Sequence, residues 1–344
     1  MRKNKSNQSR LPLTISAQYG LVDQITFFNK VVASTDLSNY YLLKKGEFAY
    51  NKSYSSDYPW GAIKRLDNYD QGALSSLYIC FAPQDNIVSD FILQYFESPK
   101  WHKGISEIAV EGARNHGLLN VAVQDFFHTY HYVPKDKKEQ IKISKLLMLL
   151  DERISTQNKI IDKLQSLIRG IAQKIVHSNK TNVRLSECVE CSSSTLQESD
   201  VCEHGAYPVY GANGIVGYLD NYNTEGEAVY IIKDGSGVGT VSYVTGKCSA
   251  TGTLNTLQAK EGYSLQYLYY LLKVFNFEPY KTGMAIPHIY FKDYGKAKFF
   301  CPSYIEQLQY AQSLSAIDSK LLVEKNILTS LSMQKQYLLR QMFI

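Results

Sequence analysis

The sequence predicts a mixed α/β fold in which two small α/β heads are separated by two long antiparallel helices. The helices are expected to form a coiled coil and to give the molecule pseudo-two-fold symmetry. Three observations support this prediction: a long segment with a seven-residue apolar repeat occurs twice, a strand-rich stretch of similar length precedes each copy, and the two stretches resemble each other weakly. Two similar heads at a fixed spacing would suit a target that has two halves.

The duplicated helix is the strongest signal. Its copies begin at residues 136–140 (DKKEQ) and 303–307 (SYIEQ), each shortly after a proline that ends the preceding strand. Both starts carry a capping box, in which the first side chain accepts an amide hydrogen bond and a glutamate three residues later reaches back. About 40 residues at about 1.5 Å each predict helices of about 60 Å.

Apolar residues in both copies recur every seven positions, as in a coiled coil. The residues that we expect to pair the helices are Leu147, Ile154, Ile161, Ile168, Leu314, Leu321 and Leu328. Gln157 and Glu324 interrupt the seams at equivalent positions, and a polar residue there fixes helix register at a cost in stability. The symmetry predicts antiparallel pairing, within one chain or between two; the alternative is two amphipathic helices packed on separate domains.

This organisation predicts four segments. The first head spans residues 1–133, the first long helix 134–180, the second head 181–301 and the second long helix 302–344. We expect strands at 77–81, 228–233 and 239–244, and helices at 90–97 and 265–275. The matching stretches 120–126 and 288–294 are expected to be strands as well.

The composition allows a folded protein with several kinds of partner. The 344 residues are 44% hydrophobic, which suffices for a sizeable core. The net charge is +5, with +6 on residues 134–180 and −3 on residues 181–300, so a nucleic-acid partner is permitted but not required. We expect neither a membrane span nor a signal peptide, because no run of 18 apolar residues occurs and no apolar stretch follows the basic start. Six cysteines without such a signal predict free thiols and a cytoplasmic location.

The sequence carries no catalytic motif. It has neither the Asn-Pro-Pro-aromatic string of an adenine methyltransferase nor a P-loop, so we predict no catalytic residue. Residues 234–239 (DGSGVG) are expected to form a tight turn between two strands, with a phosphate cradle as the alternative. Cys188, Cys191, Cys202 and His204 could hold zinc, but one Cys-x2-Cys pair is weak evidence, and we predict no metal.

The duplicated heptad element behind two heads resembles the specificity subunit of type I restriction–modification systems. Strings similar to those of that family's target-recognition domains are residues 46–52 (GEFAYNK), 72–78 (GALSSLY), 112–121 (GARNHGLLNV) and 210–218 (YGANGIVGY). The second head opens with residues 183–188 (VRLSEC), a family-like strand and helix, whereas nothing equivalent precedes Leu11. The first head is therefore expected to lack its opening element.

The resemblance implies that each target-recognition domain reads one half of a split double-stranded DNA sequence and that the helices set the spacer. Two modification subunits would dock on the helices and methylate adenine, and restriction subunits would complete the cleaving complex. The chain itself would be non-catalytic and hold no cofactor, because S-adenosylmethionine, ATP and Mg would belong to the partner subunits. The competing hypothesis is a protein adaptor with two binding heads on a rod; a metal enzyme is a third.

Polar, basic and tyrosine side chains on loops and strand ends are the candidates for contacts with phosphates and base edges. In the first head they are Asn51, Lys52, Tyr54, Lys64, Arg65, Ser75, Arg114 and Asn115. In the second head they are Tyr210, Asn213, Lys233, Ser236, Tyr243, Lys247, Thr251 and His288. Arg114 and Asn115 have the side chains that pair with guanine and adenine, although a polar loop in solvent is the alternative for this segment.

Overall fold

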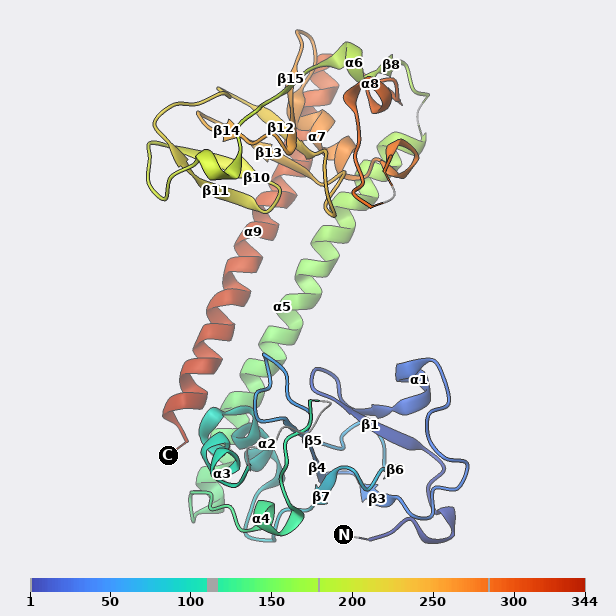
Figure 1. The fold of residues 1–344 in the computed structure, drawn as a ribbon, viewed down its shortest axis with the longest axis vertical. Helices are drawn as coiled ribbons and strands as arrows, with labels where there is room; N and C mark the ends of the chain where they lie inside the picture. The colour runs from blue at the N-terminus through green and yellow to red at the C-terminus, as the bar shows by residue number, and fades with distance from the viewer. Residues whose placement is uncertain (1, 110–116, 179, 284, 344) are drawn as a thin grey trace. The chain divides into compact units, whose positions relative to one another are not determined.

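The computed structural model describes residues 2–109, 117–178, 180–283 and 285–343 (Figure 1). They form two compact units. Unit 1 consists of Met1–Gln157 and Ile327–Ile344, and unit 2 of Asn158–Asn326. The long helices α5 (Lys137–Ser178) and α9 (Tyr304–Gln341) each contribute residues to both units, so each unit holds one head and a part of each helix.

The two long helices begin where the duplicated capping signals predict. Before α9, the Ser303 hydroxyl accepts a hydrogen bond from the Glu306 amide at 3.4 Å, and the Glu306 carboxylate accepts one from the Ser303 amide at 3.1 Å. This reciprocal pair is a complete capping box. Before α5, the Asp136 carboxylate accepts from the Lys138 amide at 2.8 Å.

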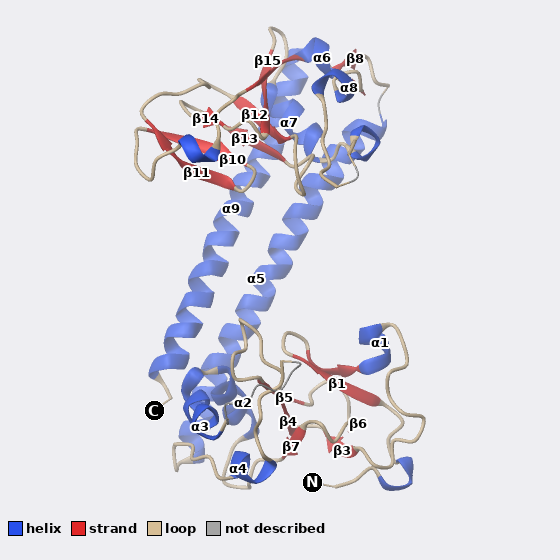
Figure 2. Ribbon diagram, in the orientation of Figure 1, coloured by secondary structure: helices blue, strands red, loops and turns tan. Residues whose placement is uncertain are grey.

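The described residues of the first head form two sheets, with strand orders β2-β1-β6-β3 and β5-β4-β7 (Figure 2). The strands are β1 (Pro12–Ser16), β2 (Gly20–Asp23), β3 (Tyr41–Lys44), β4 (Phe48–Asn51), β5 (Ala62–Arg65), β6 (Gln71–Leu74) and β7 (Ile79–Phe81). The α-helices are α1 (Gln24–Phe28), α2 (Ser89–Glu97), α3 (His102–Ile108) and α4 (Val123–Phe127), and two 3-10 turns lie at Lys5–Asn7 and Pro99–Trp101.

In the second head, the part of the chain that the structure describes forms three sheets, with strand orders β11-β10-β14, β13-β12-β15-β9 and β16-β8. The strands are β8 (Val183–Arg184), β9 (Val189–Ser193), β10 (Tyr207–Gly211), β11 (Gly214–Leu219), β12 (Ala228–Ile232), β13 (Val241–Val244), β14 (Ser249–Ala250), β15 (Leu254–Ala259) and β16 (Lys298–Phe299). The α-helices are α6 (Leu185–Cys188), α7 (Leu265–Lys273) and α8 (Phe291–Tyr294), and 3-10 turns lie at Glu198–Asp200 and Glu278–Tyr280.

The two heads share one topology. In the first, β1 pairs antiparallel with β2 and parallel with β6; in the second, β10 pairs antiparallel with β11 and parallel with β14. The antiparallel set β5-β4-β7 recurs as β13-β12-β15, and α2 and α7 each follow the last of these strands. Among the described residues of the first head, β8, α6 and β9 have no counterpart.

The strands expected at 120–126 and 288–294 are wrong. The structure has a short helix at each place, α4 and α8. Both segments are brief apolar runs, and the periodicity of such a run does not separate a strand from one buried turn of helix. In each helix a single aromatic ring near the C-terminal end is buried, Phe126 in α4 and Tyr294 in α8.

One apolar core joins the first head to both long helices. Its buried members include Phe48, Tyr50, Phe91, Tyr95 and Trp101 of the head, Ile143 and Leu147 of α5, and Leu339 and Phe343 at the end of α9. Lys335 of α9 also forms an ion pair with Asp151 of α5. Because the start of α5 meets the end of α9, the helices are antiparallel in unit 1, as predicted.

The residues predicted to pair the helices are buried or half-buried along both helices. Leu147, Ile161, Ile168, Leu314 and Leu321 are at most 7% exposed, and Ile154 and Leu328 are half-buried. Gln157 and Glu324 are buried as well, at 8% and 6% exposed. The polar interruptions of the seams therefore lie inside, where a side-chain amide or carboxylate constrains its neighbours most.

Each long helix is fixed to its head by a buried glutamine. The Gln140 carboxamide accepts from the Val88 amide at 2.7 Å, at the start of α2, and donates to the Pro134 carbonyl at 2.8 Å. The Gln307 carboxamide does the same in unit 2, accepting from the Ser264 amide at the start of α7 at 2.9 Å and donating to the carbonyl of Pro302. We call this pair of contacts the glutamine clamp.

A repeated aspartate adds a second link farther along each helix. In unit 1, Asp151 accepts a hydrogen bond from the side chain of Gln94 in α2 at 2.9 Å. In unit 2, Asp318 accepts from the hydroxyl of Tyr270 in α7 at 3.1 Å. The clamp and the aspartate use duplicated positions of the sequence, so the same joint between head and helix is built twice.

We predict that Leu147→Ala lowers the free energy of unfolding by about 2–5 kcal/mol, because the side chain is 0% exposed and its removal leaves a cavity. The matched control is Leu149→Ala on the same helix, where Leu149 is 58% exposed and the loss should stay within about 0.5 kcal/mol. Urea unfolding followed by circular dichroism measures both. Equal losses would show that the seam does not pack as described.

A half-buried histidine makes the stability of unit 1 pH-dependent. Burial lowers the pKa of His131 below its ordinary value of about 6.5, and its two ring nitrogens each lie 3.0 Å from a hydroxyl, those of Tyr95 and Thr129. As pH falls below about 6.5, this histidine becomes protonated in the unfolded chain but stays neutral in the folded chain. The free energy of unfolding therefore falls.

We predict that His131→Gln flattens this dependence in urea titrations at pH 7.5, 6.5 and 5.5. Burial also lowers the pKa of His102, so a part of the slope remains in the variant. The variant's overall stability is not the readout, because the substitution also changes packing. An unchanged slope between pH 7.5 and 5.5 would contradict the assignment to His131.

Candidate nucleic-acid interface

In both heads a lysine directly follows the central strand of a sheet, β4 or β12. The backbone carbonyl of this lysine accepts a hydrogen bond from the loop that precedes the last short helix of the head, α4 or α8. The Lys52 carbonyl, after β4, accepts from the Leu119 amide at 2.9 Å. The Lys233 carbonyl, after β12, accepts from the Ile289 amide at 2.9 Å. Equivalent strands therefore present a lysine at the same kind of loop junction.

The second-head loop surface consists of residues 233–237, 251–253 and 285–289. The Gly235 amide donates to the Pro287 carbonyl at 3.0 Å, and the His288 ring lies 2.9 Å from the Asp234 carboxylate. The Lys233 amide donates to the Thr253 carbonyl, also at 3.0 Å. These bonds hold three loops that are distant in sequence against one another.

Five predicted residues lie in or beside the second-head loop surface: Tyr210, Lys233, Ser236, Thr251 and His288. Ser236 is exposed, and Lys233 and His288 are half-buried. Thr251 is 1% exposed and shares a hydrogen bond of 2.8 Å with Thr253, so in the free protein it shapes the loop from inside. Its contact with DNA stays a prediction.

The glycine-rich segment 234–239 is a tight turn between β12 and β13. The Gly239 amide donates back to the Ile232 carbonyl at 2.9 Å, and Gly235 and Gly239 both have positive φ angles. In the neighbouring loop, glycine is also required at position 283, because a Cβ there would lie 2.3 Å from the Ile286 carbonyl oxygen. The turn hypothesis is thus confirmed by the backbone geometry.

The first-head loop surface consists of residues 51–54 and 117–121. The Tyr54 amide donates to the Gly117 carbonyl at 3.0 Å, and the Lys52 ammonium lies 3.5 Å from the Val121 carbonyl. Tyr54 is 52% exposed, while the Asn51 side chain accepts from the Ser53 amide. Arg114 and Asn115 lie outside the described residues. In the sequence they come shortly before residues 117–121 of this surface.

Three further predicted residues of the first head also have internal partners. Lys64 pairs with Glu97 at 2.7 Å. Arg65 is 12% exposed at its side chain and pairs with Asp67 and Asp90, each at 2.7 Å, which ties β5 to the start of α2. The Ser75 hydroxyl accepts from the Leu77 amide in the turn after β6.

The remaining predicted residues of the second head are spread over other places. Asn213 is exposed in the turn between β10 and β11. Lys247 is exposed between β13 and β14, 3.7 Å from Glu225 and 4.8 Å above the ring of Tyr222. Tyr243 instead faces α7, with its ring 5.5 Å from that of Tyr269.

Comparison with known proteins identifies the domain that carries the second-head loop surface. Residues 177–333 match the family model described as the type I restriction modification DNA specificity domain. The chain carries such a domain. Its resemblance to type I specificity subunits is therefore confirmed.

Two curated relatives match shorter stretches. One is the type I restriction enzyme EcoprrI specificity subunit of Escherichia coli, 27% identical over 113 residues, which is 33% of this chain and 28% of the relative. The other, from Haemophilus influenzae, is named a type I restriction enzyme specificity subunit and is 35% identical over 82 residues, 23% of this chain and 21% of the relative. The matched stretches thus span less than a third of either relative.

A solved structure extends the similarity to the fold of the whole chain. The S subunit of a type I restriction–modification system from M. genitalium superposes with a TM-score of 0.64 at 19% identity, covering 100% of this chain and 93% of that one. At this identity the match concerns the fold alone. It agrees with the predicted mixed α/β architecture with two long helices.

Two exposed residues in or beside the second-head loop surface of this specificity domain are absent from the predicted set. Ile286 is 59% exposed and Tyr290 48% exposed, and the Lys292 ammonium lies 5.2 Å from the Tyr290 ring centre. An aromatic ring with a cation above it offers a stacking face and a positive charge together. The run His288-Ile289-Tyr290 carries this signal, but the sequence analysis predicts a strand there.

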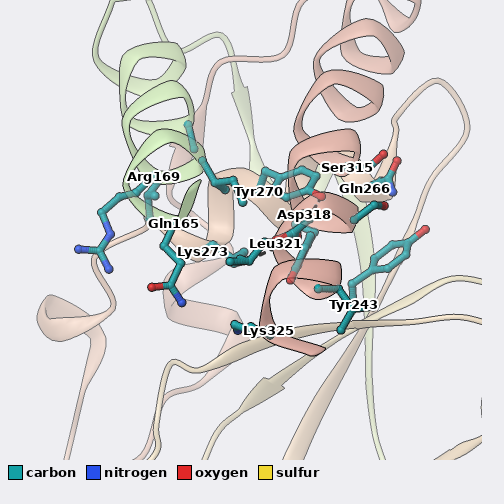
Figure 3. A pocket seen from close by; sticks show the side chains of 16 residues that line it. Gln165, Arg169, Tyr243, Gln266, Tyr270, Lys273, Ser315, Asp318, Leu321 and Lys325 are labelled. Atoms are coloured by element: carbon teal, nitrogen blue, oxygen red, sulfur yellow. Dashed lines mark hydrogen bonds and ion pairs between the residues drawn. The ribbon is translucent and has the colours of Figure 1, made fainter. Parts of the chain in front are cut away.

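Sequence reasoning also missed a cavity of about 800 Å³ in unit 2, lined by α5, α7, α9 and β13 (Figure 3). Asp318 lies on its wall, 3.6 Å from the Lys273 ammonium, with the Tyr270 hydroxyl as its hydrogen-bond donor. Burial raises the pKa of Tyr243, which therefore stays neutral on the same wall. The Lys273 ammonium is held by Asp318 and by neighbouring tyrosine rings, so the wall is a structural joint.

The cysteines are free thiols in the structure. Cys188 and Cys301 are both buried, with their sulfur atoms 3.9 Å apart, and Cys202 is exposed. Within the described ranges, no group of three or more His, Cys, Asp or Glu side chains is placed to hold a metal ion. Nor does that part of the chain contain a helix long and apolar enough to cross a membrane.

Proposed function

We propose that this chain recognises DNA sequence-specifically as the specificity subunit of a type I restriction–modification complex, each head reading one half of a bipartite site. The observation that carries the proposal is the repetition of one design. Both heads place a lysine-ended strand against a polar loop and fix the head to a long helix with the same glutamine clamp. One of these heads lies in a DNA specificity domain.

The two loop surfaces suit the two tasks of DNA recognition. Lysine at a strand end neutralises phosphates and fixes orientation without carrying sequence information. Neighbouring Asn, Ser, Tyr, Arg and His side chains supply the donors, acceptors and stacking faces that read base edges. We therefore assign sequence reading to the two loop surfaces and, in the first head, also to Arg114 and Asn115, which lie outside the described residues.

In this proposal the long helices set the spacer between the half sites and dock two modification subunits, and restriction subunits complete the cleaving complex. The chain has no catalytic role of its own and works in the cytoplasm. S-adenosylmethionine, ATP and Mg belong to the partner subunits. The basic charge of residues 134–180, +6, also suits a helix that lies near DNA.

The alternative is a protein adaptor with two binding heads, which the acidic charge of residues 181–300, −3, favours. Co-expression with cognate modification subunits, followed by genome-wide mapping of methylated adenine, separates the two functions. A bipartite methylated motif supports the DNA function. A stable complex that methylates no motif supports the adaptor.

We predict that Lys52→Gln and Lys233→Gln each weaken DNA binding by the assembled complex and lower the slope of log affinity against log salt by about one, because each removes a phosphate contact. Affinity at several salt concentrations measures this. The matched control is Lys103→Gln, because the Lys103 side chain is 84% exposed on α3 of the first head and outside the loop surface. If Lys103→Gln weakens DNA binding as much as the two variants do, Lys52 and Lys233 are not specific phosphate contacts.

We predict that replacing Gln157 and Glu324 together by Leu changes the preferred spacer length or the oligomeric state, because buried polar residues fix the register of paired helices. Methylation mapping reports the spacer, and light scattering reports the mass. If both properties stay as in the natural chain, the two side chains do not set register.

A further inference from the structure

The second head is closed by its opening segment, residues 183–193. Strand β9 of this segment extends the sheet beyond β15, with Cys191 opposite Leu257. Strand β8 pairs with β16 just before α9 begins, with Val183 opposite Phe299. The segment thus covers a sheet edge and the strand that leads into the long helix.

The segment is held chiefly by its main chain. The Leu185 and Ser186 amides donate to the Ala297 and Gly295 carbonyls, both at 2.9 Å, and the Lys260 amide donates to the Cys188 carbonyl at 2.9 Å. Three of its side chains are completely buried, those of Leu185, Cys188 and Val189. An occupant of such a place therefore needs an extended backbone and apolar residues in the spacing apolar-x-x-apolar-apolar.

The first head offers only one of the two receiving strands, because its described residues form no strand in the place of β16. Strand β7, the counterpart of β15, is the edge strand of the sheet β5-β4-β7. The N-terminal residues pair elsewhere: the Leu42 amide donates to the Arg2 carbonyl at 3.0 Å, and Lys3 bridges to Tyr41. They therefore cover β3, in the other sheet, and leave β7 at an edge.

The segment that leads into α5 forms no strand, and three of its aromatic side chains are exposed. Residues 127–133 correspond to 295–301, because buried Phe126 and Tyr294 near the ends of α4 and α8 precede them and Pro134 and Pro302 follow them. Phe127 is 54% exposed, Tyr130 91% and Tyr132 73%. Exposed apolar side chains that gather in one place mark interaction surfaces, whereas single ones are common on any folded domain.

We propose that this open side of the first head, β7 together with residues 127–133, binds an extended segment of another polypeptide chain in the strand–turn–strand form of residues 183–193. Unpaired strand edges bind peptides through main-chain hydrogen bonds, and side-chain pockets add specificity. The occupant is a peptide because a peptide fills the equivalent place in the second head. The exposed rings of Phe127, Tyr130 and Tyr132 would pack against the apolar side chains of the bound peptide.

The test uses the full-length chain and a synthetic peptide of residues 182–194. Hydrogen–deuterium exchange is measured by mass spectrometry with and without saturating peptide. Exchange at residues 79–81 and 128–133 should slow by about tenfold or more, because new main-chain hydrogen bonds form there. A control peptide with proline at the positions of Leu185 and Glu190 cannot donate these bonds and should have no effect.

A variant pair shows whether the aromatic rings take part. Phe127→Asp with Tyr132→Asp should weaken peptide binding at least tenfold, whereas Tyr19→Asp, at a ring 68% exposed elsewhere in the first head, should not. Circular dichroism checks that each variant is folded. The proposal is overturned if saturating peptide leaves exchange at 79–81 and 128–133 unchanged, or if the protection appears instead at β15, through displacement of β9. Equal binding by both sets of variants would overturn it too.

Discussion

The structure depends on one contact made twice, the buried carboxamide that joins a long helix to its head. Gln140 and Gln307 are 1% and 2% exposed, and each carboxamide is satisfied at both its oxygen and its nitrogen. A buried carboxamide left without partners costs about 1–3 kcal/mol, so the head and the helix can join only in the geometry that satisfies it. Each clamp thereby fixes the direction in which a helix leaves its head.

The same constraint connects the fold to DNA recognition. The clamp holds the first turn of α2 or α7, the helix that follows the strand set containing β4 or β12. These two strands end at Lys52 and Lys233, where the loop surfaces begin. A reading surface is useful only when it has a fixed orientation, and a repeated joint gives both surfaces the same relation to their helices.

The sequence was sufficient to predict the features that depend on a long repeat, namely the two long helices and the duplication of the heads. Five heptads and two capping-box signatures predicted the extents of α5 and α9, although only the box before α9 forms completely, and the duplication predicted the common design of the heads. The sequence was not sufficient to predict which side chains are available to contact DNA, because this depends on their hydrogen-bond and ion-pair partners. Arg65 looked available for DNA but lies between Asp67 and Asp90, and Thr251 is buried beneath its loop. Such partners are distant in sequence, so no local pattern reveals them.

Helix α9 ends inside the core of the first unit, which gives the chain an order of folding. Unit 2 is a continuous stretch, Asn158–Asn326, whereas unit 1 needs Ile327–Ile344 to complete its core beside Ile143 and Leu147. On the ribosome the first head emerges first but must wait for contacts more than 200 residues downstream. The head made second is therefore completed first, and a nascent chain exposes the apolar surface of the first head until translation reaches the end of α9.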